Sequence, residues 1–418
     1  MIGYRCVSCS DVQNEKFAGF LCPSCGGNLD ISYDYEAIVG DIEGLKIDRP
    51  RNLFSFAPFL PVNKPDDRLP LRIGATPLYA AKRLGDSQGL RNLYLKDDTL
   101  NPSASSKDRA SAIAVCRAMD IGAQTISVAS TGNAGSSLAC VAAAVGLRAV
   151  VFVPESAPVA KLTQALSFGA TVLAIRGNYD DAFDLCLAAS AEFGWFNRST
   201  GYNPFTREGK KICAYEIWEA LDGRVPDRIV VPSGDGNLLS GMWKGWCDLK
   251  GVGLVDRMPK IDCVQSESSA AINNTVHKLR SGNVADLDWS RVTIEEVKAN
   301  TVADSIAVDR PRDGLAAVRA IIESGGEAIS IPDKNILTAI PEMAKLSGVF
   351  PEPAAAAPWA AVKQMVSENR IEADELVVCL VSGSGLKDVG SAQRAAGESL
   401  VIDPSVDAVR DVLPRRSL

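Results

Sequence analysis

The chain has little histidine, no excess of positive charge and no long apolar run. His277 is the single histidine among 418 residues, which excludes zinc hydrolases built on several His ligands and leaves any Ser-His-Asp triad dependent on this one side chain. We expect His277 to lie on a helix surface. Acidic residues outnumber basic ones by 51 to 44, so no net positive field attracts nucleic acid or anionic lipid. The apolar stretches 138–147 and 149–154 are interrupted by Arg148 and fall short of the ~20 residues of a membrane span.

The N-terminus also lacks the pattern of a signal peptide, because Met1 is followed by a charged segment that contains cysteines. Apolar residues make up 46% and charged residues 23% of the chain, which is ordinary for a globular protein and argues against disorder. The length corresponds to about three domains of ~150 residues and can bury a large core. We therefore predict a soluble, cytoplasmic protein with no membrane or nucleic-acid partner.

The 11 cysteines form two groups. Two Cys-x-x-Cys pairs, Cys6 with Cys9 and Cys22 with Cys25, lie close together near the N-terminus, and two glycines follow the second pair. Paired knuckles can supply four thiolates in a tetrahedral array, so they predict a structural zinc site in a zinc-ribbon-like module; two disulfides are the alternative. The others are isolated in apolar segments, which indicates buried free thiols: Cys116, Cys140, Cys186, Cys213, Cys247, Cys263 and Cys379.

From Asn92 onward, short apolar or β-branched runs alternate with stretches of helical periodicity. Strands are predicted over 92–96, 124–129, 148–153, 170–175, 227–231, 260–265, 327–331 and 375–381. Helices are predicted over 107–121, 134–146, 158–168, 179–193, 209–222, 238–249, 267–280, 313–324, 333–347, 353–369 and 387–396. This alternation predicts an α/β fold whose parallel sheets are covered by helices on both faces. Eight strands are more than one such open sheet usually carries, so we expect two lobes.

The regions before and after this alternation are less regular. Residues 31–75 are predicted to be a connecting region, and the last ~20 residues a polar tail. We predict a zinc-ribbon-like module over 1–30, a large α/β lobe over 31–105 and 206–418 that binds the cofactor, and a smaller α/β lobe over 106–205.

Ligands in such folds bind where carboxyl ends of strands meet amino ends of helices, so the loops after the strands deserve inspection. The first reads Asn101-Pro-Ser-Ala-Ser-Ser-Lys107-Asp-Arg109. Lys107 and Arg109 fall in the first turn of a helix, whose dipole together with Arg109 favours the neutral amine that a Schiff base needs. A solvated Lys-Asp-Arg cluster is the alternative for this segment.

Three further loops carry groups that suit a phosphorylated ring compound. Ser130-Thr-Gly-Asn133 can present backbone N–H groups to an anion, and its asparagine can reach a phenolic oxygen. Gly234-Asp-Gly236-Asn-Leu238 is typical of a phosphate nest, although Asp235 suits such a nest only if it points outward. Ser382 follows the most apolar strand, where its hydroxyl can bind a ring nitrogen. Together with a Schiff-base lysine, these groups predict a pyridoxal phosphate site.

The same motifs resemble threonine synthase and its paralogues, which share the tryptophan-synthase-like, type II fold of pyridoxal phosphate enzymes. The likeness runs from Thr76 to Asp388 in the same order. It implies that Lys107 carries the cofactor, that Asn133 contacts its ring hydroxyl and that Ser382 is the partner of its pyridine nitrogen. It further implies a phosphate cup made by Gly234, Asp235, Gly236, Asn237 and Leu238.

The resemblance implies a lyase that converts O-phospho-L-homoserine and water to L-threonine and phosphate, and it implies a homodimer. Three positions depart from the family's pattern: Ser106 before the lysine, the cup after Gly234, and Lys210-Lys211-Ile212 after Glu208-Gly. The last of them adds a cation near the expected substrate region. Candidate substrate-binding residues are Arg109, Ser130, Thr131, Gly132, Lys210 and Lys211, of which the three cations could recognise a phosphate leaving group.

Two other classes of function remain open for the sequence. β-Replacement on O-phosphoserine, as in cysteate synthase, or ammonia-lyase action on a hydroxy amino acid would use the same cofactor. A non-catalytic paralogue, with the cysteine module recruiting partners, would not need the lysine.

Overall fold

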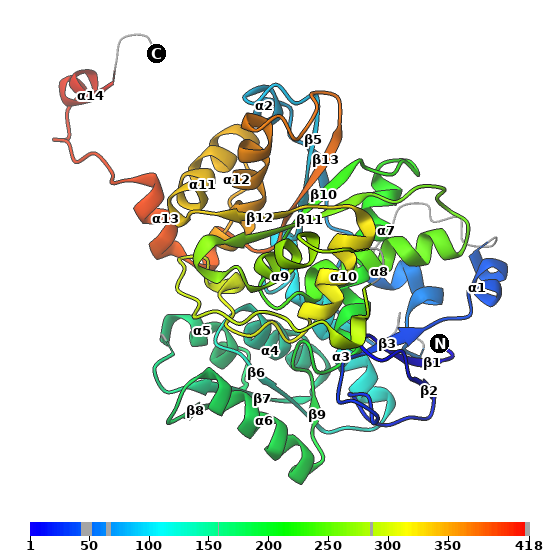
Figure 1. Ribbon diagram of the computed structural model, residues 1–418. Helices are drawn as coiled ribbons and strands as arrows, with labels where there is room; N and C mark the ends of the chain where they lie inside the picture. The colour runs from blue at the N-terminus through cyan, green and yellow to red at the C-terminus, as the bar shows by residue number, and fades with distance from the viewer. Residues whose placement is uncertain (43–51, 64–67, 158, 285–286, 414–418) are drawn as a thin grey trace.

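The computed structural model describes residues 1–42, 52–63, 68–157, 159–284 and 287–413 (Figure 1). Parts of the predicted connecting region, the first residue of the helix predicted over 158–168 and the end of the predicted tail lie outside these ranges. The described strands form three sheets, in the orders β2-β1-β3, β12-β11-β10-β13-β5-β4 and β8-β7-β6-β9. Two of the sheets are built from parallel strands, apart from one antiparallel edge strand, so the predicted α/β fold with a separate N-terminal cysteine module is confirmed.

The six-stranded sheet lies between two layers of helices (Figure 1). Its strands are β4 (Leu78–Ala80), β5 (Asn92–Asp97), β10 (Arg228–Pro232), β11 (Lys260–Ser266), β12 (Ala328–Ile331) and β13 (Leu376–Val381). One face carries α7 (Phe205–Ala220), α8 (Asn237–Gly251), α9 (Ala271–Arg280) and α10 (Gly314–Ser324), and the other α2 (Lys82–Asp86), α11 (Asp333–Ser347) and α12 (Pro353–Ser367). Because side chains alternate along a strand, Ile229 and Val231 join the core beneath α8 while Val230 joins the core beneath α12.

The four-stranded sheet repeats this arrangement on a smaller scale. It contains β6 (Thr125–Ala129), β7 (Arg148–Pro154), β8 (Thr171–Ile175) and β9 (Phe196–Asn197). The helices around it are α3 (Lys107–Asp120), α4 (Asn133–Val145), α5 (Val159–Ser167) and α6 (Tyr179–Phe193). Helices α3 and α7 pack together and join the two halves of the molecule. The domain boundaries predicted from the sequence stay predictions.

The N-terminal sheet is formed by β1 (Gly3–Cys6), β2 (Val12–Asn14) and β3 (Leu29–Ser32). Polar contacts anchor it to α7 and α8: Asp30, which is partly exposed, pairs with Arg207 at 2.9 Å and with Lys244 at 3.0 Å. The buried Tyr33 hydroxyl donates to Glu208 at 2.5 Å. The module therefore packs against α7 and α8, which precede and follow the glycine-rich loop at Gly234–Gly236.

Each predicted helix and strand from Asn92 onward is present, with small shifts at the ends. One of the two largest shifts at a helix start is that of α7, which begins at Phe205 instead of 209. The Asn203 side chain accepts a hydrogen bond from the Phe205 N–H at 2.9 Å and so begins the helix earlier. His277 is exposed on α9, as predicted.

The expected connecting region needs correction, because its described part contains packed structure. Helix α1 (Tyr35–Ile42) and the 3-10 helix η1 (Leu53–Phe59) form there. Phe56 and Phe59 of η1 are buried and pack on the Tyr215 ring of α7, with centroid distances of 5.3 and 4.9 Å. The prolines in this region thus interrupt long elements without preventing burial.

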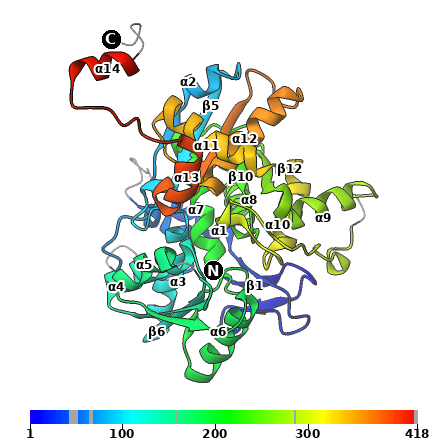
Figure 2. The same cartoon turned by 90° about the vertical axis from the view of Figure 1, so that its left-hand side faces the viewer.

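Short elements at other connections were also not predicted. They are η3 (Asp98–Leu100), η5 (Trp289–Arg291), η6 (Asp304–Ile306) and η7 (Gly385–Lys387), while η4 (Glu267–Ser269) takes the first residues of the helix predicted over 267–280. The C-terminal region contains α13 (Val389–Ala396), which was predicted over 387–396, and adds α14 (Val406–Val412), which stands apart from the rest of the chain in both views (Figures 1 and 2). Over the described residues, none of the helices combines the length and the apolarity that crossing a bilayer requires.

Candidate active site

A cavity of about 490 Å³ lies at the carboxyl ends of strands from both parallel sheets. All four loops predicted from the sequence contribute to its wall. The predicted residues that line it are Lys107, Ser130, Thr131, Gly132, Asn133, Lys210, Gly234, Asp235, Gly236, Asn237, Leu238 and Ser382. The structure therefore brings together groups that are up to 275 positions apart, between Lys107 and Ser382. The volume of this cavity is ordinary for a small-molecule site.

Lys107 is the first residue of α3 and is held next to the loop that follows β13. The Ser106 N–H donates to the Ser382 carbonyl at 2.8 Å, and the Ser384 N–H donates to the Ala104 carbonyl at 3.0 Å. Burial lowers the pKa of the Lys107 amine, the charge of Glu352 raises it, and the charge of Arg198 lowers it further. A lowered pKa increases the fraction of the neutral, nucleophilic amine.

The glycine-rich loop before α8 has the geometry of an anion nest. Gly236 has φ +92°, and a Cβ at this position would lie 2.8 Å from the Asp313 carbonyl oxygen. A Cβ at Gly234 would lie 2.8 Å from the Ile306 Cα, so neither position has room for a side chain. The first N–H groups of a helix have no acceptor within the helix, and α8 directs them to the cavity from a run of 15 residues.

Lys210 adds a positive charge to this nest. Its Nζ donates to the Asn237 Oδ1 at 2.7 Å, and the Asn237 amide donates to Asp313 at 2.8 Å. Burial lowers the pKa of Lys210 well below its usual value, and the charges of Lys107 and Arg198 lower it further. An anion bound at the nest would relieve this mutual repulsion.

Asp235 belongs to the cavity wall at the nest, where the backbone before α10 holds its side chain. Its Oδ1 accepts the Arg312 N–H at 2.6 Å, and its Oδ2 is buried with no hydrogen-bond partner among the described residues. Burial raises the pKa of this carboxyl to about 7, and the charge of Asp313 raises it as well. A carboxyl that is protonated near neutral pH can donate a hydrogen bond to an anion, which removes the expected conflict.

Asn133 and Ser382 line the same cavity as the nest and Lys107. The Asn133 amide donates to the Glu352 carboxylate at 2.9 Å and to the Ser305 hydroxyl at 3.1 Å. Burial raises the pKa of Glu352, while the charge of Lys107 lowers it. Ser382 is buried directly after β13. Within one cavity, an amide and a hydroxyl can orient a planar polar ring through hydrogen bonds.

Arg198 is a cavity residue that the sequence analysis missed. It is fully buried directly after β9, where its Nε donates to the Ser111 hydroxyl at 3.3 Å and its Nη1 to the Thr200 hydroxyl at 3.1 Å. Its Nη2 has no hydrogen-bond partner among the described residues, and burial lowers the pKa of the guanidinium to about 10. The two-residue strand β9 is too short to show a periodic pattern, so the loop after it gave no signal.

Two predicted substrate-binding cations, Arg109 and Lys211, lie elsewhere. Arg109 is fully buried and pairs with Asp98 at 2.8 Å and with Glu216 at 2.7 Å. The pKa of Arg109 is therefore raised, and this residue is not the cause of the lowered pKa of Lys107. Neither Arg109 nor Lys211 lines the cavity, which corrects the expectation that both bind the substrate.

Lys211 is neutralised in the same way. It pairs with Glu208 at 2.6 Å and with Asp248 at 2.8 Å, and its Nζ lies 3.9 Å from the centre of the Tyr33 ring. All of these partners belong to the contact between α7, α8 and the N-terminal module. Lys210 and Lys211 are adjacent in sequence, yet the helix directs them to different surroundings.

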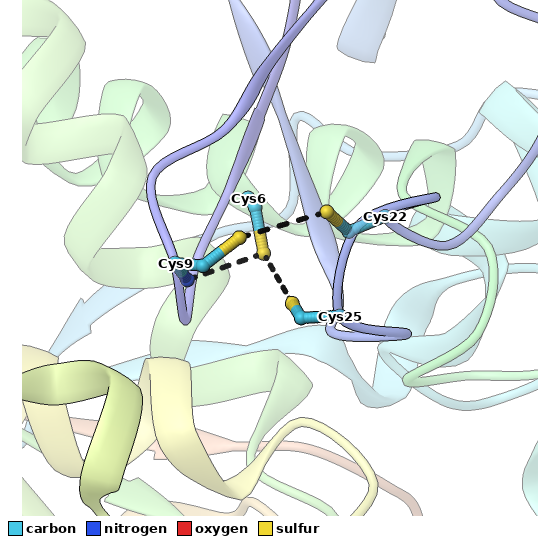
Figure 3. Close-up of side chains that lie close together, drawn as sticks. All are labelled: Cys6, Cys9, Cys22 and Cys25. Carbon is cyan, nitrogen blue, oxygen red and sulfur yellow. Dashed lines mark hydrogen bonds between the residues drawn. The ribbon is translucent and has the colours of Figure 1, made fainter.

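The four N-terminal cysteines form a compact cluster (Figure 3). The Sγ atoms of Cys6 and Cys25 are 3.5 Å apart, those of Cys9 and Cys22 are 3.7 Å apart, and all four lie within 4.8 Å of one another. A tetrahedral site with Zn–S bonds of ~2.3 Å places its sulfurs about 3.8 Å apart. All four are free cysteines, so the disulfide alternative is not realised, and the donor set fits a zinc ion.

Comparison with known proteins agrees with this geometry. The family model described as "Pyridoxal-phosphate dependent enzyme" matches residues 69–383. A threonine synthase of Methanosarcina acetivorans is 36% identical over 99% of both chains, and one of Methanocaldococcus jannaschii is 33% identical over 98% of both. Among solved structures, threonine deaminase isoform 2 of Solanum lycopersicum has a TM-score of 0.65 at 17% identity, covering 88% of this chain and 96% of its own, which shows a shared fold.

Proposed function

The chain belongs to the pyridoxal-phosphate dependent enzymes, among the threonine synthases, and we propose that it converts O-phospho-L-homoserine and water to L-threonine and phosphate. The observation that carries this proposal is the cavity in which a reactive lysine, an anion nest and buried cations without carboxylate partners face one another. The relatives do not favour cysteate-synthase-like β-replacement or an ammonia-lyase reaction.

The residues present fit pyridoxal phosphate at both of its ends. Lys107 would hold the cofactor through its amine, and the nest from Gly234 to Leu238 with Lys210 would bind its phosphate. Asn133 would bind the ring hydroxyl, and Ser382 the ring nitrogen. When bound, pyridoxal phosphate supplies an electron sink that stabilises negative charge on the substrate carbon next to the amino group.

Lys107 would also move protons during turnover. The Lys107 amine would lie beside the substrate's Cα and Cβ, and burial lowers its pKa, so that its neutral form would be available to accept a proton. Threonine formation requires proton removal from Cα and Cβ, departure of phosphate from Cγ, protonation at Cγ, addition of the hydroxyl of water at Cβ and return of a proton to Cα. One positioned base next to Cα and Cβ suits the proton removals.

The loop Ser130-Thr131-Gly132 would bind the substrate carboxylate. It leads into α4, whose first N–H groups favour an anion. The Gly132 N–H lies 3.3 Å from the Ser130 hydroxyl, which keeps the loop turned toward the cavity. Carboxylate binding there would place the substrate's Cα between this loop and Lys107.

The decisive experiment is a substrate panel with purified protein loaded with pyridoxal phosphate. We expect O-phospho-L-homoserine to yield phosphate and L-threonine in equal amounts, measured by phosphate assay and chromatography. O-Phospho-L-serine and L-threonine serve as the comparison substrates. Absence of phosphate release from O-phospho-L-homoserine would refute the proposal.

Cys6, Cys9, Cys22 and Cys25 would hold a structural zinc ion. Backbone N–H groups support the thiolates: the Cys9 N–H donates to the Cys6 sulfur at 3.5 Å, and the Gly27 N–H to the Cys25 sulfur at 3.4 Å. None of the four cysteines lines the cavity, so their role would be to stabilise the N-terminal module. The homodimer and the cytoplasmic location stay predictions.

A further inference from the structure

The Asn28 side chain connects the N-terminal module to the segment that precedes α10. Asn28 follows the second cysteine pair, and its carbonyl accepts the Val7 N–H at 2.9 Å inside the module. Its amide reaches out of the module and donates to the Arg312 carbonyl at 2.6 Å and to the Asp313 Oδ1 at 3.1 Å. The loop of the second cysteine pair is therefore bonded directly to the segment before α10.

This segment before α10 in turn holds the backbone of the glycine-rich nest. The Arg312 N–H donates to the Asp235 Oδ1 at 2.6 Å, and the Asp313 N–H donates to the Asp235 carbonyl at 3.0 Å. The Asp313 carbonyl oxygen also closes the space beside Gly236. Two consecutive backbone N–H groups therefore set the position of Asp235, which lies between the two glycines of the nest.

The Asp313 carboxylate is fully buried and joins this segment to the helices at the nest. It accepts hydrogen bonds from the Asn237 amide at 2.8 Å, the Ser240 hydroxyl at 2.6 Å and the Arg207 Nε at 3.3 Å. Because a carboxylate only accepts hydrogen bonds, the Asn237 nitrogen faces Asp313 and the Asn237 oxygen is left for Lys210. The position of the Lys210 amine at the nest thus depends on Asp313.

A second link from the module ends at the same carboxylate. Asp30, on β3, pairs with Arg207 at 2.9 Å, and the buried Arg207 guanidinium pairs with Asp313. Neither Asn28 nor Asp30 lines the cavity, yet both links end at Asp313. In a buried network of charges and hydrogen bonds, loss of one partner disturbs the others, so the effect of either link extends to the nest.

We propose that Asn28 and Asp30 are positioning residues for the cofactor's phosphate, and that the N-terminal module raises cofactor affinity through Asp313. This inference rests on the cofactor-binding role given to the nest under the proposed function. N–H groups that already point toward a ligand bind it more tightly, because less ordering is needed on binding. Asn28 and Asp30 would hold the nest and Lys210 in this arrangement without touching the cofactor.

The test compares Asn28→Ala with wild type, both prepared free of cofactor. We expect the dissociation constant for pyridoxal phosphate, measured by absorbance titration, to rise about tenfold, because the Asp313 carboxylate loses a donor. The dissociation constant for pyridoxal, which lacks the phosphate, should change by less than about twofold. Zinc content should equal that of the wild type. Tyr33→Phe is the matched control, because it removes an anchor of the module to Glu208, which does not line the cavity; it should leave both constants within about twofold of wild type.

Two further variants trace the path from the module to the nest. Asp30→Asn keeps the size of the side chain and tests the second link even if the alanine variant misfolds; it should weaken binding of pyridoxal phosphate several-fold and leave pyridoxal unaffected. Asn28→Ala combined with Lys210→Met should cost less binding free energy than the sum of the two single variants, because both act on the same nest.

Four results would overturn the proposal. Unchanged binding of pyridoxal phosphate in both module variants would show that the links do not act on the nest, and equal losses for pyridoxal phosphate and pyridoxal would show a general structural role. Additive effects in the double variant, or a phosphate-selective loss in Tyr33→Phe, would also contradict the path through Asp313. Because cofactor binding is the readout, the result is independent of whether the wild type makes threonine.

Discussion

Two sets of buried basic residues in this molecule differ in what neutralises them. Arg109 and Lys211 each pair with two carboxylates at the packing surfaces of α7. Arg198 and Lys210 are equally buried, yet they pair with no carboxylate among the described residues and line the cavity. A buried cation that the protein neutralises itself is a structural element, whereas one without a carboxylate partner marks a place for an anionic ligand.

The largest expected effect comes from Lys107, which lines the same cavity as Arg198 and Lys210. Lys107→Ala should reduce threonine formation by at least about 1,000-fold and abolish borohydride-trappable attachment of the cofactor. The fold should persist, because Lys107 has no ion pair among the described residues. Circular dichroism checks folding, and mass spectrometry checks the adduct. Lys278→Ala, at an exposed position, is the control; wild-type turnover by the Lys107 variant would contradict the assignment.

Removal of a carboxylate that neutralises Arg109 should affect the stability of the fold more than the rate of the reaction. Glu216 neutralises both Arg109 and Lys96, at 2.7 and 2.6 Å, so Glu216→Gln should lower the free energy of unfolding by ~3–5 kcal/mol. Urea unfolding measures this loss.

Lys210→Met tests a cation without a carboxylate partner, again by urea unfolding. The variant should lose little free energy of unfolding, but it should bind the cofactor at least tenfold more weakly. The comparison fails if the two variants lose equal stability.

The N-terminal module should show a smaller effect on catalysis. Cys22→Ser removes one of the four sulfurs in the cluster, so zinc content should fall from about one ion per chain toward zero. We expect easier proteolysis of the first 30 residues and a loss of turnover of less than about tenfold, since the module contacts α7 and α8 outside the cavity. Metal analysis and limited proteolysis are the measurements, and full zinc content in the variant would contradict the ligand set.

The smallest expected effect concerns the pH dependence of the nest. Asp235 has a pKa of about 7, so it gains negative charge as pH rises through 7 and should then repel the cofactor's phosphate. The affinity of the cofactor-free protein for pyridoxal phosphate should therefore fall between pH 6 and 8. This fall should be several-fold larger in wild type than in Asp235→Asn. Cofactor titration followed by fluorescence measures it. Identical pH profiles would show that Asp235 does not act on the nest.

The local patterns of the sequence predicted much of the fold and most of the cavity lining. Strand-and-helix alternation placed Lys107, Asn133, Gly234 and Ser382 at the starts of helices or the ends of strands, and such positions converge in any parallel sheet. Arg198 could not be found in this way. It follows a strand of two residues, and the absence of a partner for its Nη2 is visible only when every neighbouring group is in place.

The sequence by itself determined the alternating elements, the two cysteine knuckles and the glycines of the nest, because these depend on periodicity and on backbone conformation over a few residues. Only the tertiary structure decided which cations serve the ligand and which serve the fold. Arg109 is neutralised by Glu216, 107 positions away, and Lys210 and Lys211 are separated only by the direction each takes from α7. Neutralisation of a buried charge depends on distance in space, and a local sequence pattern does not contain that distance.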